Sequence, residues 1–331
     1  MTRYVKDLEI ALNAVREAAA VCRSVQASIS ADSLEKKDNS PVTVADFASQ
    51  ALICRSLQAI FPDDPVIGEE GAEELRTESG AAFLQRIVEE CGNVGVAATG
   101  DEICEWIDRG GLQEYRRRFW TLDPIDGTKG FLRKEQYAIS LALIVDGEIQ
   151  IGILGCPNMP LDSSKPDGAR GILAWAIKGE GSFVQALDEP DSEPARASVS
   201  TTDSSASARF CESVESGHSS HGWSGRIASQ LEISREPFRI DSQCKYLAVA
   251  MGDADIYLRL PTRKGYQEKI WDHAGGILVV EEAGGTVTDI HGNTPEFKHG
   301  ATLSANEGMV VTNGKFHCAV VDAVKQNAPN E

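Results

Sequence analysis

Five acidic residues have the side chains and the positions that could hold divalent cations: Asp46, Glu69, Asp123, Asp126 and Asp272. Hard cations such as magnesium prefer oxygen ligands, which carboxylates supply. Several carboxylates held close together would repel one another unless a cation neutralised them. The same cation could acidify a bound water, polarise a phosphoryl group and stabilise a leaving oxygen. These residues therefore point to metal-assisted hydrolysis of a phosphate ester.

The most informative spacing lies in the run Asp-Pro-Ile-Asp-Gly-Thr, residues 123–128. Pro124 fixes its own φ and disfavours a helical conformation at Asp123, so the two carboxylates can turn toward one point. Gly127 permits a tight bend or the close approach of a ligand. Thr128 adds a hydroxyl, and the amides after it could meet an anion at a helix start. Asp-Pro and Asp-Gly are also turn formers, so this run alone leaves a plain turn open.

The other three carboxylates also have purely structural interpretations. Asp46 could belong to a capping box that opens a helix at Thr43. Glu69 and Glu70 could form a solvated surface pair. Asp272 could be the N-cap of the helix that follows it. The conjunction of all five carboxylates, rather than any one of them, favours a metal site.

The charge of the chain limits its partners. The 331 residues carry a net charge of −18, so the field of the protein repels nucleic acid and anionic membranes. An acidic site can hold a phosphate only if cations lie between the two. We therefore expect a small-molecule partner, with no nucleic acid and no membrane, and we expect a monomer.

The compartment is indicated by the cysteines and by the lack of targeting segments. The eight cysteines form no CxxC pair, which favours buried thiols in a reducing compartment. No apolar run approaches the ~20 residues that span a bilayer, and the first residues lack the apolar core of a signal peptide. The sequence thus predicts a cytoplasmic protein.

Periodic patterns indicate the elements that must position the carboxylates. Helical spacing of apolar residues predicts a helix over residues 5–29 and a second one from about residue 43. Residues 137–145 and 148–154 flank an Asp-Gly turn and predict a hairpin, and residues 171–185 predict another. After a polar stretch over residues 188–208, short strands and helices alternate, at residues 209–214, 223–231, 254–260, 272–283 and 286–289.

This change of pattern predicts a mixed α+β and α/β protein with two domains and a boundary near residues 155–165. The first, residues 1–158, would be an α+β domain with the metal-binding carboxylates. The second, residues 159–331, would be an α/β domain with further substrate contacts and the last metal ligand.

The combined motifs resemble the inositol monophosphatase superfamily of lithium-sensitive, magnesium-dependent phosphatases. Its signature is Asp-Pro-(Ile/Leu)-Asp-Gly-Thr with Gly-Glu-Glu upstream and Trp-Asp downstream. The matching segments here are residues 123–128, 68–70 and 271–272. The resemblance implies a layered αβαβα sandwich, as in inositol monophosphatase and fructose-1,6-bisphosphatase. It also implies two to three magnesium ions per site and inhibition by lithium.

Within this superfamily the chain is most similar to the 3′(2′),5′-bisphosphate nucleotidases. The resembling segments are residues 40–46, 215–221, 241–246, 257–261 and 265–276. The resemblance implies hydrolysis of 3′-phosphoadenosine 5′-phosphate to AMP and phosphate. Many of these nucleotidases also hydrolyse the sulfated form, 3′-phosphoadenylyl sulfate, to adenylyl sulfate, which leaves this second substrate open here. Cys244 departs from the family pattern, which commonly has a small residue such as alanine there.

The resemblance implies a role for each matching position. A first magnesium would be held by Glu69, Asp123 and the Ile125 carbonyl, and a second by Asp123, Asp126 and Asp272. A third, weaker ion would lie near Glu69 and Asp46. Asp46 and Thr128 would activate the attacking water. The substrate would be bound by Thr128, His218, Ser242, Lys245, Arg259 and Asp272.

Other functions on the same fold stay open. Inositol polyphosphate 1-phosphatase and inositol monophosphatase activities are the nearest alternatives. Ser242, Lys245 and Arg259 favour a nucleotide, because lysine and arginine pair well with a second phosphate. Alone, Lys245 and Arg259 could be surface ion-pair residues and His218 a plain loop residue. A non-catalytic phosphonucleotide sensor would be expected to lack a metal ligand, whereas all five carboxylates are present.

Overall fold

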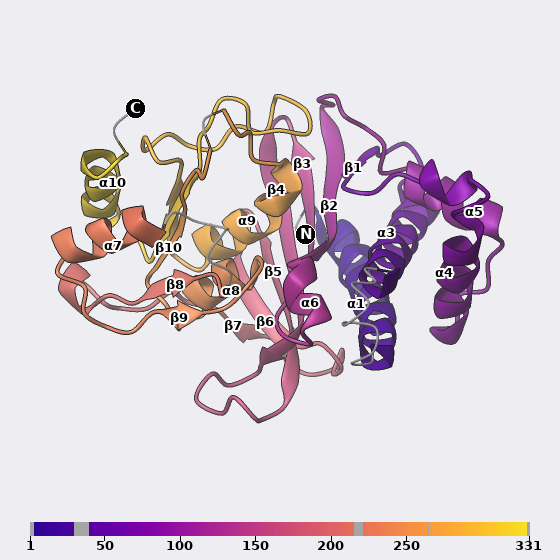
Figure 1. The fold of residues 1–331 in the computed structure, drawn as a ribbon, viewed down its shortest axis with the longest axis horizontal. Coiled ribbons are helices and arrows are strands. Elements are labelled where there is room, and N and C mark those ends of the chain that lie inside the picture. Colours follow the sequence, from indigo (N-terminus) through magenta and orange to yellow (C-terminus); the bar gives the residue numbers. More distant parts are fainter. Residues whose placement is uncertain (1–2, 30–39, 215–220, 264, 330–331) are drawn as a thin grey trace.

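The computed structural model describes residues 3–29, 40–214, 221–263 and 265–329, arranged as alternating layers of helices and sheets (Figure 1). The first layer contains α1 (Val5–Ser28) and α3 (Ser40–Ile60), which pack against each other. The helix predicted over residues 5–29 is confirmed. Its buried stripe contains Ala11, Val15, Ala18, Cys22 and Val25.

Two shorter helices, α4 (Ala81–Asn93) and α5 (Gly100–Asp108), pack against α3. The start of α5 is fixed by a capping box, in which the Glu102 amide donates to the Thr99 hydroxyl at 3.3 Å and the Thr99 amide donates to the Glu102 carboxylate at 2.8 Å. A 3-10 turn, η1 (Glu74–Arg76), precedes them.

The second layer is a seven-stranded sheet whose strands follow one another in chain order. Only its first pair, β1 with β2, is parallel. The strands are β1 (Val66–Gly68), β2 (Arg118–Asp126), β3 (Ala138–Val145), β4 (Glu148–Pro160), β5 (Arg170–Ile177), β6 (Gly181–Ala186) and β7 (Ala195–Arg196). Both predicted hairpins are confirmed. The turn between β3 and β4 has positive φ at Asp146 (55°) and Gly147 (81°), as an Asp-Gly turn requires.

The third layer contains α8 (Cys244–Ala250) and α9 (Ala274–Glu282), which lie between the first sheet and a second one (Figure 1). The second sheet has five strands in the order β11-β12-β10-β8-β9. These are β11 (Thr286–Thr288), β12 (Met309–Thr312), β10 (Ile256–Arg259), β8 (Phe210–Glu212) and β9 (Phe238–Arg239). On its outer face lie α7 (His221–Gln230) and α10 (His317–Gln326). The layered αβαβα sandwich is confirmed.

Sheet membership bears on the predicted domain boundary. Residue 158 lies inside β4, and β5, β6 and β7 continue the same sheet to Arg196. The second predicted hairpin, β5 and β6, belongs to the same sheet, because β5 pairs with β4. The change of sequence pattern near residue 160 therefore does not coincide with the passage of the chain from the first sheet to the second. The two-domain division, with its boundary near residues 155–165, stays a prediction. Among the described helices, none combines the length and the apolar character needed to cross a membrane.

Candidate metal and substrate site

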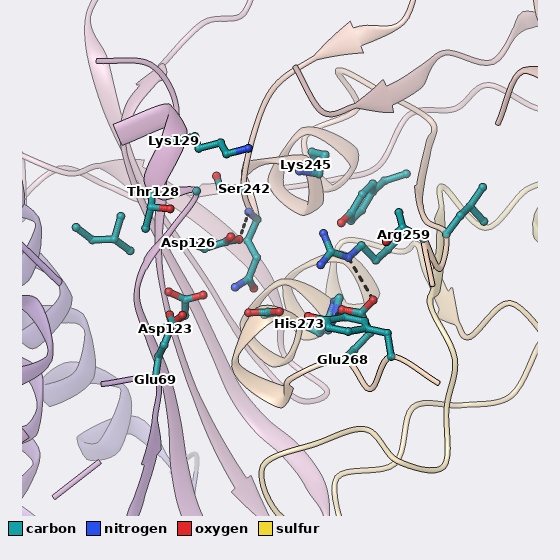
Figure 2. Close-up of a pocket in the computed structure, with 18 of the residues that line it drawn as sticks. Glu69, Asp123, Asp126, Thr128, Lys129, Ser242, Lys245, Arg259, Glu268 and His273 are labelled. Atoms are coloured by element: carbon teal, nitrogen blue, oxygen red, sulfur yellow. Dashed lines mark hydrogen bonds and ion pairs between the residues drawn. The ribbon is translucent and has the colours of Figure 1, made fainter. Parts of the chain in front are cut away.

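A cavity of about 460 Å³ lies where the end of β2 meets α8 and the 3-10 turn η3 (Ile270–Asp272) (Figure 2). Glu69 and Asp123 lie on one side of it, with Lys245 and Arg259 on the other. All but two of the predicted site residues line it, namely Glu69, Asp123, Ile125, Asp126, Thr128, Ser242, Lys245, Arg259 and Asp272. Of the remaining two, Asp46 lies behind the carboxylates in α3, and His218 lies outside the described residues.

The parallel pairing of β1 and β2 brings the first carboxylates together. Gly68 is in register with Leu122, so Glu69 and Asp123 follow at the same edge of the sheet. The ladder between β2 and β3 is irregular between Asp123 and Asp126. Such a bulge re-aims side chains, and here both carboxylates line the cavity.

Gly127 ends this strand with a backbone conformation that other residues rarely adopt. Its φ is 91°, and α6 (Thr128–Leu132) begins directly after it. A Cβ atom at Gly127 would lie 2.9 Å from the Cβ of Ser242, which is closer than real contacts allow. The glycine therefore lets the loop after Asp126 approach the start of α8.

We predict that Gly127→Ala destabilises the protein by about 1–3 kcal/mol through the left-handed strain, and by more through the contact with Ser242. It should also lower kcat because Asp126 is displaced. Gly95→Ala is the matched control, since Gly95 has a φ of 89° but no atom within 4 Å of the added Cβ. Denaturant unfolding and phosphate release measure both effects. Equal losses in the two variants would contradict the prediction.

Asp46 lies in the interior of α3 and not at its start. The helix begins at Ser40, so the capping box predicted at Thr43 is wrong. The physical reason is Pro41, which is tolerated in a first turn, where its missing N–H is not needed. One turn beyond Asp46, the Ser49 hydroxyl donates to the Pro124 carbonyl at 3.0 Å. This bond ties the face of α3 that carries Asp46 to the loop of Asp123.

Asp272 does not cap a helix, which excludes the alternative, purely structural interpretation of this residue. It ends η3, whereas α9 begins at Ala274 with His273 as its N-cap residue. The φ of −136° at His273 separates the 3-10 turn from the helix. The Asp272 side chain is therefore free to line the cavity.

Burial and mutual repulsion raise the pKa values of several carboxyl groups in this site. Burial is the main cause for Asp46 and Asp123, whose pKa values lie well above the usual range, and neighbouring carboxylates add to the shift. Burial, together with Glu70 and Asp126, raises the pKa of Glu69 to about 7. Burial likewise raises the pKa of Asp272 to about 7.

The causes of the pKa shifts of Asp46 and Asp123 include no positively charged partner. The Oδ1 atoms of Asp46 and Asp123 are buried and have no hydrogen-bond partner among the described residues. Buried carboxylate oxygens are costly unless they are paired or coordinate a metal. The side chains around the Asp123 edge of the cavity therefore fit divalent cations.

A second group of possible ligands, Glu268, Asp272 and His273, also lines the cavity. Among the described residues, these three place one candidate atom each within 4.8 Å of one another. Glu268 is already engaged, because it accepts from Arg259 Nε at 3.2 Å and lies 3.2 Å from His273 Nε2. Burial would raise the pKa of Glu268, but these two partners lower it to about 2. We therefore infer that Glu268 is the ion-pair partner of Arg259 and not a ligand of a metal ion.

The two positively charged residues that were predicted to bind substrate, Lys245 and Arg259, face the cavity rather than the outer surface. Lys245 is only 4% exposed, and its Nζ lies 5.2 Å from the ring centroid of Tyr257. Burial lowers its pKa, which the Asp126 carboxylate opposes. Arg259 does form an ion pair, but its partner Glu268 lies in the cavity wall. Both cations are thus available to an anion in the cavity.

Two important side chains were not given roles by the sequence. Gln243 and Glu268 lie within segments that resemble the nucleotidases, yet no role follows from their types. Gln243 contacts Asp126, Trp271 and Ser140, all remote in sequence. Only the tertiary structure shows these contacts. The one signal in the sequence that could have singled out Gln243 and Glu268 is their place within segments that resemble the nucleotidases.

Known proteins resemble this chain along nearly its whole length. The model of the inositol monophosphatase family matches residues 4–328. The chain is 40% identical to the "3′(2′),5′-bisphosphate nucleotidase" of Schizosaccharomyces pombe over 96% of this chain and 94% of that protein. The protein of the same name from Emericella nidulans is also 40% identical, over 98% of both chains. That from Oryza sativa is 41% identical, over 97% of this chain and 94% of that protein.

Solved structures share the fold at much lower identity. The Thermotoga maritima IMPase superposes with a TM-score of 0.62 at 18% identity, over 98% of both chains. An inositol monophosphatase from Anabaena gives a TM-score of 0.61 at 19% identity, over 98% of this chain and 97% of that one. At these identities the likeness concerns the fold alone. Together with the match of the family model along nearly the whole sequence, it leads to one assignment: the chain belongs to the inositol monophosphatase family.

Proposed function

We propose that this enzyme hydrolyses the 3′-phosphate of 3′-phosphoadenosine 5′-phosphate, giving AMP and phosphate. The observation that carries the proposal is one cavity with carboxylates at one wall and two cations, Lys245 and Arg259, at the other. A nucleoside bisphosphate needs both kinds of wall, one for the reacting phosphate and one for the second phosphate. Support comes from full-length relatives at about 40% identity that are named 3′(2′),5′-bisphosphate nucleotidases.

We propose that the carboxylates of this cavity bind two to three magnesium ions. Glu69, Asp123 and the Ile125 carbonyl would hold one, and Asp123, Asp126 and Asp272 another. A weaker ion would lie near Asp46. When bound, magnesium supplies an acidified water and polarises the phosphoryl group. Lithium inhibition is part of the same proposal.

The remaining steps belong to side chains of the chain itself. Asp46 and the Thr128 hydroxyl orient the attacking water, and the hydroxyl takes the proton of the water while it passes its own proton to Asp46, whose Oδ1 is buried and partnerless. Ser242, Lys245 and Arg259 bind the nucleotide away from the reacting phosphate. Thr128 and Asp272 contact the substrate at the reacting end, and His218 stays a predicted contact outside the described residues.

Phosphate release from a substrate panel tests this function. The panel contains 3′-phosphoadenosine 5′-phosphate, its sulfated form, inositol 1,4-bisphosphate and inositol 1-phosphate, each with magnesium and with added lithium. We expect the highest kcat/KM for 3′-phosphoadenosine 5′-phosphate and inhibition by millimolar lithium. A preference for either inositol phosphate would instead support the inositol phosphatase alternatives.

Lys245→Met tests how the second phosphate is held. A charge-assisted hydrogen bond to a phosphate contributes about 1.5–3 kcal/mol, so KM for 3′-phosphoadenosine 5′-phosphate should rise roughly 10- to 100-fold. KM for inositol 1-phosphate, which has no second phosphate, should change little. The control is Lys178→Met, because Lys178 pairs with Glu148 outside this cavity. An unchanged KM in folded Lys245→Met would remove Lys245 from substrate binding.

We also propose that the protein acts as a monomer in the cytoplasm, on a small phosphonucleotide and without nucleic-acid or membrane partners. A reducing compartment suits its cysteines, all eight of which are unpaired thiols. Size-exclusion chromatography with light scattering measures the oligomeric state directly.

A further inference from the structure

Gln243 lies at the start of α8, is only 2% exposed, and uses both ends of its amide. Its Nε2 donates to the Trp271 carbonyl at 2.9 Å. Its Oε1 accepts from the Ser140 hydroxyl at 3.0 Å and from the Gly276 amide at 3.3 Å. Its backbone N–H donates to Asp126 Oδ2 at 2.6 Å. One residue therefore contacts β2, β3, η3 and α9.

Two of these contacts hold opposite walls of the cavity. Asp126 belongs to the end of β2, and the Trp271 carbonyl belongs to the same planar peptide unit as the Asp272 amide. Fixing that carbonyl fixes the point from which the Asp272 side chain projects. Gln243 thus links one carboxylate through its backbone and the other through its side chain.

The backbone before Gln243 is strained in a way that serves this contact. Ser242 has a φ of 65°, in the left-handed region that serine rarely adopts. Its hydroxyl accepts from the Cys244 amide at 3.2 Å, which helps to hold the turn. Such strain persists only where the surroundings impose it, and it concentrates at functional sites. Here it accompanies the short contact from the Gln243 amide to Asp126.

We infer that Gln243 is a positioning residue that fixes the separation of Asp126 and Asp272, and thereby sets the affinity of the cavity for the divalent cation held between them. The inference rests on the proposed function, because it takes these two carboxylates as ligands of one ion. Residues that orient metal ligands typically change affinity 10- to 100-fold when they are replaced. Gln243 acts through Asp126 and the Trp271 carbonyl, so we class it as a positioning residue and not as a catalytic one.

Gln243→Met is the main test. Methionine has nearly the same length and keeps the backbone N–H to Asp126, but it cannot hold the Trp271 carbonyl. We expect the dissociation constant of one Mn²⁺ ion to rise about 10- to 100-fold, measured by calorimetry without substrate. We expect kcat to recover at saturating metal, while KM for substrate changes little. Thermal unfolding in EDTA verifies that the variant is folded.

Ser140→Ala is the matched control, because it removes a hydrogen bond from the same Gln243 oxygen but leaves the Trp271 carbonyl held. It should lose comparable stability and keep its Mn²⁺ affinity within about twofold. A merely structural role of Gln243 would instead give the two variants the same metal affinity.

Gln243→Asn is the second variant, since it keeps the amide and shortens its reach by one carbon. It should weaken Mn²⁺ binding as the methionine does. A folded Gln243→Met or Gln243→Asn protein with wild-type Mn²⁺ affinity would overturn the inference. Failure of both variants to fold would also count against it, because a positioning residue is dispensable for the fold.

The same measurements separate this inference from the proposed function. Mn²⁺ binding is measured without any substrate, and phosphate release from 3′-phosphoadenosine 5′-phosphate is measured on the unmodified protein. If that protein releases no phosphate but its Mn²⁺ affinity depends on Gln243, the proposed substrate is wrong and the positioning role stands.

Discussion

Asp123→Asn is expected to lower kcat by a factor on the order of 10³ or more, because this carboxylate is shared by both proposed magnesium positions. A metal that polarises a phosphoryl group stabilises the transition state by several kcal/mol, and each ~1.4 kcal/mol is tenfold in rate. The free energy of unfolding should not fall in parallel. Asp123 is buried with one partnerless oxygen, and charges on Glu69 and Asp126 disfavour its ionised form. A neutral amide should therefore leave the metal-free protein at least as stable.

Two measurements test this separation of activity from stability. Phosphate release gives kcat, and thermal unfolding in EDTA at pH 8 gives the midpoint temperature. The control is Asp253→Asn, because Asp253 is another carboxylate whose pKa is raised by burial and whose Oδ2 is buried without a partner. It does not line the cavity, so kcat should not change. A folded Asp123→Asn protein with wild-type kcat would rule out this site.

Removal of divalent cations should destabilise the protein more at pH 8 than at pH 5.5. The pKa of Glu69 is raised from 4.5 to about 7 and that of Asp272 from 3.8 to about 7 in the metal-free fold. Between these limits the folded state binds more protons than the unfolded state, so stability falls as pH rises. The penalty is complete above the folded pKa values. Magnesium neutralises the same carboxylates and should abolish most of this slope.

Thermal unfolding at both pH values, in EDTA and in magnesium, measures the effect. In EDTA the midpoint should be roughly 5–10 °C lower at pH 8 than at pH 5.5. Glu281, whose pKa burial raises to about 7 away from this cavity, contributes equally with and without metal. The difference between the pH dependence in EDTA and that in magnesium therefore reports on the carboxylates of the cavity and not on Glu281. Parallel curves in EDTA and magnesium would show that the carboxylates do not bind the ion.

The elements that the sequence predicted well are those fixed by local interactions. The helix α1 follows from apolar residues at helical spacing, which bury one stripe whatever they pack against. The hairpin of β3 and β4 follows from Asp146 and Gly147, whose types suit the positive φ values that the turn requires. In both cases the signal and the structure it predicts lie within a few residues of each other.

Helix ends were predicted less well, because capping signals are ambiguous. Thr43 and Asp46 have the spacing of a helix start, but the chain before them is already helical. Asp272 is of a type that caps helices, yet the 3-10 turn places it one residue too early. Asp272 lines the cavity and Asp46 lies behind it, and residue type alone could not distinguish capping from the proposed roles of these two carboxylates.

The convergence of the site could not be derived from local pattern. Glu69 lies beside Asp123 because β1 and β2 pair in parallel across about fifty residues of chain. The family resemblance predicted that Glu69 and Asp123 lie close together, and the structure shows the strand register that brings them there. The link from Gln243 to Asp126 and Trp271 was accessible to neither pattern nor motif, because it depends on the packing of α8 between two sheets.

The short strands at the sheet margins have a consequence for self-association. The first sheet ends in three-residue β1 and two-residue β7, and the second in three-residue β11 and two-residue β9. A strand of another molecule can form backbone hydrogen bonds only along an exposed edge strand, so short edge strands limit such pairing. Charged residues in these strands, such as Arg196 and Arg239, disfavour it further. The long apolar strands β3 and β4 are enclosed on both sides. The folded chain thus withholds its most aggregation-prone segments from other molecules.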